Sequence, residues 1–190
     1  MLDGLFLALA ALFAVVNPVS ISIYFLSLSG GMGEEARMRM AIRATAIAAL
    51  IAAGAALLGG PFLEFMGVRL GSFRIAGGIV LLLFGLKSGL GISAGRGSAG
   101  ADPTSTPLAS PLITGPGVIS VSILLSTQVG IYTCLAAIAI AMAVILLGML
   151  SANAVRRRVG DSGALVVSRV MGLVLSAVAV QFIVRGLAGG

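Results

Sequence analysis

Long stretches without a charged residue constrain this chain more than any other feature of its sequence. No Asp, Glu, Lys or Arg occurs in residues 4–33 or in residues 103–155. About 20 consecutive apolar residues are enough for a helix to cross a bilayer. The first stretch therefore holds one membrane span, and the second is long enough for two. We expect an all-α membrane protein.

The composition supports helices in a membrane rather than a soluble domain or a barrel. Hydrophobic residues make up 59% of the chain and charged residues 9%, whereas a soluble domain carries about 25% charged residues. In lipid, every backbone polar group needs a partner within the protein, so only helices and closed barrels span. Barrel strands alternate apolar and polar residues, but these stretches are continuously apolar.

The polar segments between the apolar stretches predict six membrane-spanning helices in two halves. Residues 91–108 are rich in Gly, Ser, Ala, Thr and Pro, the composition of a flexible linker. Residues 1–90 then form a first three-helix repeat and residues 109–190 a second. The expected spans, with the first and fourth broken at proline, are residues 4–33, 44–63, 70–90, 109–127, 129–151 and 163–186.

The placement of Lys and Arg predicts the orientation in an inner membrane. Cytoplasmic segments of such proteins carry an excess of these residues. With the N-terminus outside, the inside segments hold nine of the twelve Lys and Arg residues, and the outside segments hold only Arg69, Arg74 and Arg185. We therefore expect a multi-pass inner-membrane protein with both termini outside the cytoplasm.

The residue types exclude several classes of function. The chain has no His and a single Cys, Cys134, so it lacks the usual catalytic triads, His-ligated zinc sites and any disulfide framework. We expect no enzyme, no metal and no cofactor. The cations lie at the ends of apolar stretches rather than in a basic patch with interleaved aromatic residues, so we expect no nucleic-acid partner.

Matching motifs occur at corresponding places in the two halves. A proline motif lies inside the first span and again inside the fourth, and Arg-x-x-Gly opens the third span of each half. Because three spans per half is an odd number, the halves enter the membrane in opposite directions. That is an inverted-topology repeat, the layout of many secondary transporters. The motif residues are Asn17, Pro18, Ser20, Thr114, Gly115, Pro116, Gly117 and Ser120 at the prolines, and Arg74, Gly77, Arg169 and Gly172 at the third spans.

The two prolines predict broken helices near the middle of the membrane. Proline inside a helix removes a hydrogen bond and costs about 3 kcal/mol, and freed polar groups in hydrocarbon cost several kcal/mol more. Such a break persists where protein, water or a ligand satisfies the backbone. Asn17 can cap the half-helix that follows it, and Gly115 and Gly117 favour a break over a kink. The alternative is that each proline only kinks its helix.

Facing half-helices predict a binding site for a small zwitterion. Free N–H groups and the positive dipole end suit a carboxylate, and the carbonyls that end the preceding half-helices suit an ammonium group. A small neutral amino acid is the simplest ligand with both groups, since glycines leave little room for a side chain. We assign the proline-motif residues to substrate binding and the Arg-x-x-Gly residues to a structural or gating role.

Four motifs in order resemble the MarC family of integral membrane proteins, which includes SnatA-type transporters of small neutral amino acids. The resemblance covers nearly the whole chain. It implies six spans in inverted repeats and, for SnatA-like members, transport of glycine or alanine. The motifs are Asn17-Pro18-Val19 with Ile21-Ser22, Phe73 to Ile79, Thr114 to Ser120, and Arg169 to Gly172 leading to Ala179 to Ile183.

The leading hypothesis is a secondary carrier of small neutral amino acids that works by alternating access. Coupling to a proton or to sodium stays open, because few carboxylates lie within the spans. The alternatives are a passive channel, an exporter of another small solute, a membrane enzyme and a non-transporting partner. The spacings Gly67-x-x-x-Gly71 and Gly85-x-x-x-Gly89 allow close helix packing and are compatible with a homo-oligomer. The sequence leaves the substrate, the flux direction and the oligomeric state open.

Overall fold

The computed structural model describes residues 2–29, 32–90 and 116–188 of the 190-residue chain. These residues form helices joined by short connections, with no strand among them, so the all-helical prediction is confirmed. The helices are α1 (Leu2–Val16), α2 (Pro18–Leu28), α3 (Glu34–Phe65), α4 (Leu70–Gly89), α6 (Pro116–Val129), α7 (Ile131–Leu150) and α8 (Ala152–Ala188).

Five of the expected spans are long and apolar enough to cross a membrane. They are Asp3–Ile23, which runs through α1 into α2, then α3, α4 and α7, and Leu165–Ala188 of α8. The fourth expected span, 109–127, is represented by α6, which has 14 residues, fewer than the roughly 20 needed to cross. Residues 109–115 and the expected linker, 91–108, lie outside the described part of the chain.

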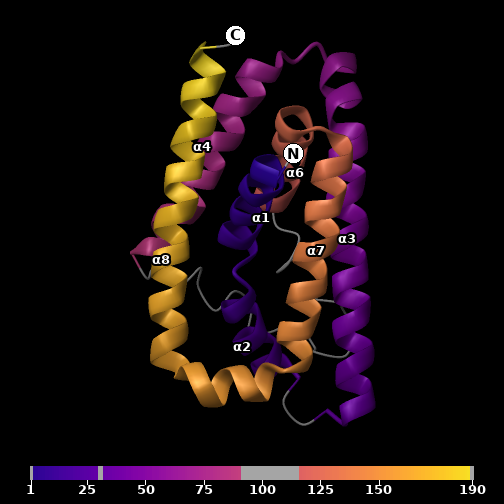
Figure 1. Ribbon diagram of the computed structural model, residues 1–190, viewed down its shortest axis with the longest axis vertical. Helices are drawn as coiled ribbons and strands as arrows, with labels where there is room; N and C mark the ends of the chain where they lie inside the picture. The colour runs from indigo at the N-terminus through magenta and orange to yellow at the C-terminus, as the bar shows by residue number, and fades with distance from the viewer. Residues whose placement is uncertain (1, 30–31, 91–115, 189–190) are drawn as a thin grey trace.

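The helices form a bundle with the broken span at its centre. In Figure 1, α3 and α7 lie side by side on the right, α4 and α8 on the left, and α1, α2 and α6 between them. Both ends of the chain lie in the upper half of this view. The end of the bundle at which the described chain begins and ends is called the terminal end below.

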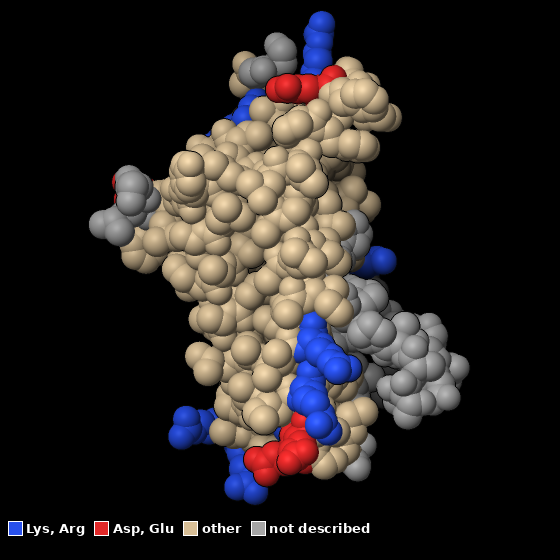
Figure 2. All heavy atoms as spheres, turned by 90° about the vertical axis from the view of Figure 1, so that its right-hand side faces the viewer, with Lys and Arg blue, Asp and Glu red and all other residues tan. Residues whose placement is uncertain are grey.

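The long helices bury small residues on one face and expose large apolar ones on the other. Helix α3 buries Ala41, Ala48, Ala52 and others at helical spacing, while Leu50 on its opposite face is 74% exposed. In Figure 2, most charged side chains lie toward the two ends of the visible face, and a broad uncharged belt lies between them. An exposed apolar belt of this kind suits the hydrocarbon core of a bilayer.

Helices α4 and α8 pack closest, because glycines from both meet at their interface. A Cβ built on Gly85 would lie 2.8 Å from the carbonyl oxygen of Gly172, and one on Gly78 would lie 2.9 Å from that of Ala179. One on Gly186 would lie 2.8 Å from the carbonyl oxygen of Gly71. These contacts recur every seven residues along an antiparallel pair, and small residues at such spacing let backbones approach closely.

The last helix begins earlier than the sequence predicted. We expected a connecting segment up to residue 163, but helix α8 starts at Ala152 and turns sharply at Gly160, whose φ is 66° and ψ 173°. Only glycine adopts this conformation readily. The segment before the turn crosses the lower end of the bundle in Figure 1 and includes the exposed Arg157 and Arg158. These charges lie at one end of the bundle, but their segment is helical rather than a connecting loop.

Candidate functional site

The first span breaks at Asn17, as its proline predicts. Asn17 has φ 46° and ψ 83°, which lie in the left-handed region. Among the residues that the structure describes, it is the non-glycine residue that has a positive φ. Helix α1 ends at Val16, and Pro18 is the first residue of α2. Proline suits a first helical position, where its missing N–H is not needed. Because Pro18 has no N–H, the carbonyl of Ala14 lacks its usual helical donor.

The side chain of Asn17 holds the start of α2. Its Oδ1 accepts a hydrogen bond from the backbone N–H of Ser20 at 3.3 Å, an N-cap. The backbone carbonyl of Asn17 accepts from Ile21 N–H at 3.1 Å, and its own N–H donates to Phe13 at 2.8 Å. The Nδ2 of Asn17 is buried and has no hydrogen-bond partner. A buried amide donor without a partner is costly.

The start of α6 lies against this break. A Cβ built on Gly117 would lie 3.1 Å from Cγ1 of Val15, the penultimate residue of α1. At the other end of the same pair, a Cβ on Gly4 would lie 3.4 Å from Val129. Helices α1 and α6 therefore run antiparallel, and their register places Asn17 level with the first residues of α6. The two proline motifs, far apart in sequence, lie next to each other.

Small and hydroxyl residues from two further helices surround the break. A Cβ on Gly148 of α7 would lie 2.7 Å from Oγ of Ser22, which donates to the carbonyl of Pro18 at 2.7 Å. On α4, a Cβ on Gly77 would lie 3.6 Å from Cβ of Ser120 in α6. The predicted binding residue Ser120 and the predicted gating residue Gly77 are thus brought together.

The two Arg-x-x-Gly motifs have different surroundings. Arg74 is half-buried, and its Nε has no hydrogen-bond partner, whereas Arg169 is exposed. Gly172 packs against Gly89 at the α4–α8 interface, unlike Gly77, which faces α6. The second motif therefore joins helices and does not approach the proline break. Thr114 and Gly115 lie outside the described residues.

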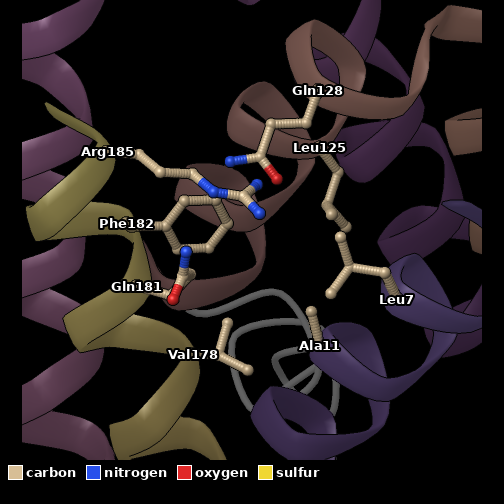
Figure 3. Close-up of a pocket in the computed structure, with 8 residues that line it drawn as sticks. All are labelled: Leu7, Ala11, Leu125, Gln128, Val178, Gln181, Phe182 and Arg185. Carbon is tan, nitrogen blue, oxygen red and sulfur yellow. The ribbon is translucent and has the colours of Figure 1, made fainter. Parts of the chain in front are cut away.

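A small cleft opens above the break, toward the terminal end of the bundle. Its volume is about 40 Å³, and it lies between α1, α6 and α8. Ala11, one of its lining residues, precedes Asn17 by six residues, a rise of about 9 Å along a helix. Figure 3 shows side chains of α8, among them Phe182 and Arg185, facing the apolar side chains of α1 and Leu125 of α6, and the surface of the cleft is almost wholly apolar. The lining residues are Leu7, Ala11, Leu125, Gln128, Val178, Gln181, Phe182 and Arg185.

Sequence reasoning missed this cleft, although it noted some of its residues. It counted Arg185 among the outside cations, included Gln181 only within the motif Ala179 to Ile183, and did not single out Gln128. The sequence does contain one signal for it. Gln128 is a polar residue within a long uncharged stretch, where the amide of its side chain needs a hydrogen-bond partner. In the described residues, no group of three His, Cys, Asp or Glu side chains could hold a metal ion.

Comparison with known proteins identifies the family. The family model described as "MarC family integral membrane protein" matches residues 2–190. The chain belongs to the MarC family. No solved structure matches this chain. Together with the five spans, the family makes it a multi-pass integral membrane protein.

Curated MarC-family relatives match along nearly their whole length. A UPF0056 membrane protein of Methanocaldococcus jannaschii is 33% identical over 96% of this chain and 95% of its own. The UPF0056 membrane protein YhcE of Escherichia coli is 33% identical over 94% of this chain and 89% of its own. The UPF0056 inner membrane protein MarC of Salmonella typhimurium is 30% identical over 95% and 92%. These names describe membrane proteins and give no substrate.

Proposed function

We propose that this protein is a secondary transporter that carries small neutral amino acids such as glycine and alanine across the inner membrane by alternating access. The observation that carries the proposal is the break at Asn17, where a capped half-helix begins beside the start of α6. In membrane transporters, discontinuous helices of this kind form the binding site at the interface of inverted repeats.

The packing of the helices supports an inverted repeat. Helix α4 packs on α8, α3 on α7 and α1 on α6. Each of these pairs joins corresponding spans of the two proposed halves, with α1 in the first span and α6 in the fourth. Figure 1 shows that each pair runs antiparallel, as halves inserted in opposite directions require. In this proposal α6 is the second part of the broken fourth span, which begins before residue 116.

The groups at the break suit a zwitterion of small size. The buried Nδ2 of Asn17 and the N-terminal end of α2 provide donors and positive potential for a carboxylate. The carbonyl of Ala14, left without a helical donor, can accept from an ammonium group. Gly117 and Gly148 bring neighbouring helices close to this point, so a ligand with a large side chain would not fit.

The coupling ion belongs to the same proposal. The described spans carry no buried carboxylate, so a proton would need a carrier elsewhere. Sodium is bound by carbonyl and hydroxyl oxygens, and Ser22 and the carbonyl of Ala14 supply such oxygens beside the break. We therefore propose sodium as the first ion to test.

Counterflow in liposomes tests the proposal. Purified protein is reconstituted in vesicles loaded with unlabelled glycine, and uptake of labelled glycine is followed. A carrier gives a transient accumulation that saturates and is competed by alanine. We expect Asn17→Ala to reduce the initial rate at least tenfold, because it removes the cap and the free amide. Asn153→Ala is the matched control, since Asn153 is exposed on the segment before Gly160.

The other outcomes separate the alternatives. Labelled glycine that equilibrates without accumulation would indicate a passive channel. No flux of any small amino acid from correctly folded protein would overturn the substrate assignment and favour another solute, exported or imported. An imposed sodium or proton gradient that drives accumulation then identifies the coupling ion.

A further inference from the structure

Helix α3 carries charged residues near its two ends and none between them. Its three cations, Arg37, Arg39 and Arg43, all lie in its first third, and Glu64 lies near its last residue. Residues 44–63 are uncharged, and about 20 such residues cross the hydrocarbon of a bilayer. A helix that fills the hydrocarbon with these residues holds Arg43 at the boundary with the headgroups of one leaflet.

Two of these cations share the outer face of α3. Arg39 and Arg43 are four residues apart, so they are neighbours on the surface of the helix, and both are exposed. Arg39 lies 3.9 Å from Glu35, an exposed pair of the kind that contributes little. Within the described part of the chain, Arg43 forms no ion pair. Figure 2, which views this side of the bundle, shows cationic side chains reaching from the lower end into the uncharged belt.

Apolar side chains continue the same face of the helix into the belt. Ile47 follows Arg43 by one turn and Leu50 by two, and they are 37% and 74% exposed. Guanidinium groups bind phosphate through paired hydrogen bonds, and exposed apolar side chains suit acyl chains. A phospholipid carries its phosphate and its acyl chains in this same order along the membrane normal.

We propose that the outer face of α3 binds an anionic phospholipid, whose phosphate lies between Arg39 and Arg43 and whose acyl chain lies along Ile47 and Leu50. The excess of positive charge favours a lipid with net negative charge, because the ammonium group of a zwitterionic headgroup would be repelled. The apolar side chains favour a lipid over free phosphate. This inference is independent of the proposed transport and of which end of the bundle is cytoplasmic.

Quenching of a single tryptophan by brominated lipids tests the site. The chain has no Trp, so Leu50→Trp places the sole indole on the outer face of α3. The full-length protein is reconstituted in phosphatidylcholine bilayers that contain a varied fraction of phosphatidylglycerol or phosphatidylcholine with brominated acyl chains. We expect the relative affinity for phosphatidylglycerol to exceed that for phosphatidylcholine by at least about threefold.

A second tryptophan position shows whether the preference belongs to α3. Leu83 is 58% exposed on α4, which lies on the opposite side of the bundle from α3 (Figure 1). Leu83→Trp in the otherwise natural chain should report no preference between the two lipids. The same preference at both positions would overturn a site on α3.

Two double variants in the Leu50→Trp background separate a site from a general attraction. Arg39→Gln with Arg43→Gln should bring the ratio of affinities to about one, because it removes the groups that hold the phosphate. Arg157→Gln with Arg158→Gln is the matched control: it removes the same charge from the same end, but from a segment that crosses the bundle. Its ratio should be unchanged, whereas equal loss in both variants would overturn the proposal. All four arginines are exposed, so the bundle should stay folded, which circular dichroism checks.

Two further outcomes would contradict the lipid assignment. Relief of the quenching by glycerol 3-phosphate in solution would make the arginines a site for free phosphate. Equal quenching by the two brominated lipids in folded Leu50→Trp protein would overturn the site altogether. The measurement contains no transport step, so absence of glycine counterflow leaves it unaffected, and the two proposals can fail separately.

Discussion

At the scale of single residues, Asn17 has two roles that can be separated. It adopts a left-handed conformation at the end of α1, and its side chain caps α2 through the N–H of Ser20. Left-handed backbone costs an ordinary L-residue about 1–2 kcal/mol, whereas asparagine tolerates it and glycine adopts it freely. Different substitutions of Asn17 can therefore separate the effect of its left-handed conformation from the effect of its cap on α2.

Replacement of Asn17 by glycine and by alanine should affect stability differently. Asn17→Ala loses the cap, worth about 1 kcal/mol, and adds the strain, for a total of about 2–3 kcal/mol. Asn17→Gly avoids the strain and also removes the unpartnered Nδ2, so we expect a loss below about 1 kcal/mol. Thermal unfolding in detergent, followed by circular dichroism, checks the order. Equal destabilisation by both substitutions would show that the left-handed conformation is unimportant.

At the scale of helices, the α4–α8 pair is held by backbone proximity rather than by large side chains. Gly78 and Gly85 of α4 and Gly172 and Gly186 of α8 leave no room for a Cβ. Ser88 of α4 donates to the carbonyl of Ser168 at 2.9 Å. Lipid tails are as apolar as the side chains, so the hydrophobic effect does not drive helices together within a membrane. Dispersion contacts and hydrogen bonds between helices do so instead. This pair is therefore expected to stay together while other helices move.

A single methyl group tests the α4–α8 interface. Gly85→Ala places a Cβ 2.8 Å from the carbonyl oxygen of Gly172, so the helices must separate. We expect the unfolding midpoint to fall by several degrees, since overpacking typically costs about 1–3 kcal/mol. Gly54→Ala in α3 is the control: nothing lies within 4 Å of its Cβ, and alanine favours the helix by up to about 1 kcal/mol. An unchanged midpoint in Gly85→Ala would contradict the close packing.

The sequence predicted elements better than it predicted their contacts. The spans followed from where charge is absent, and the break at Asn17 followed from the missing N–H of Pro18. The start of α8 was missed, because the charged cluster at Arg157 and Arg158 resembles a connecting loop in the sequence, whereas in the structure it is a helical segment across the end of the bundle. The pairing of Gly172 with Gly89 and the convergence of Gln128 with Arg185 depend on tertiary packing, which spacing alone does not contain.

At the scale of the whole molecule, both ends of the described chain lie toward one end of the bundle. Most of the Lys and Arg residues belong to the opposite end, including the segment before Gly160 and the start of α3. Because cytoplasmic segments carry an excess of cations, we expect the terminal end to lie outside the cytoplasm. The cleft beside Arg185 would then lie toward the outside.

Single cysteines at the two ends test the orientation. The natural Cys134 is buried, and Cys134→Ala removes it as a background. Ser72→Cys, at the start of α4, and Ser162→Cys, below the long part of α8, are matched because both serines are exposed. In right-side-out vesicles, a membrane-impermeant maleimide should label Ser72→Cys at once and Ser162→Cys only after permeabilisation. The reverse pattern would place the termini in the cytoplasm. Labelling of both cysteines without permeabilisation would contradict a bundle with its two ends on opposite faces of the membrane.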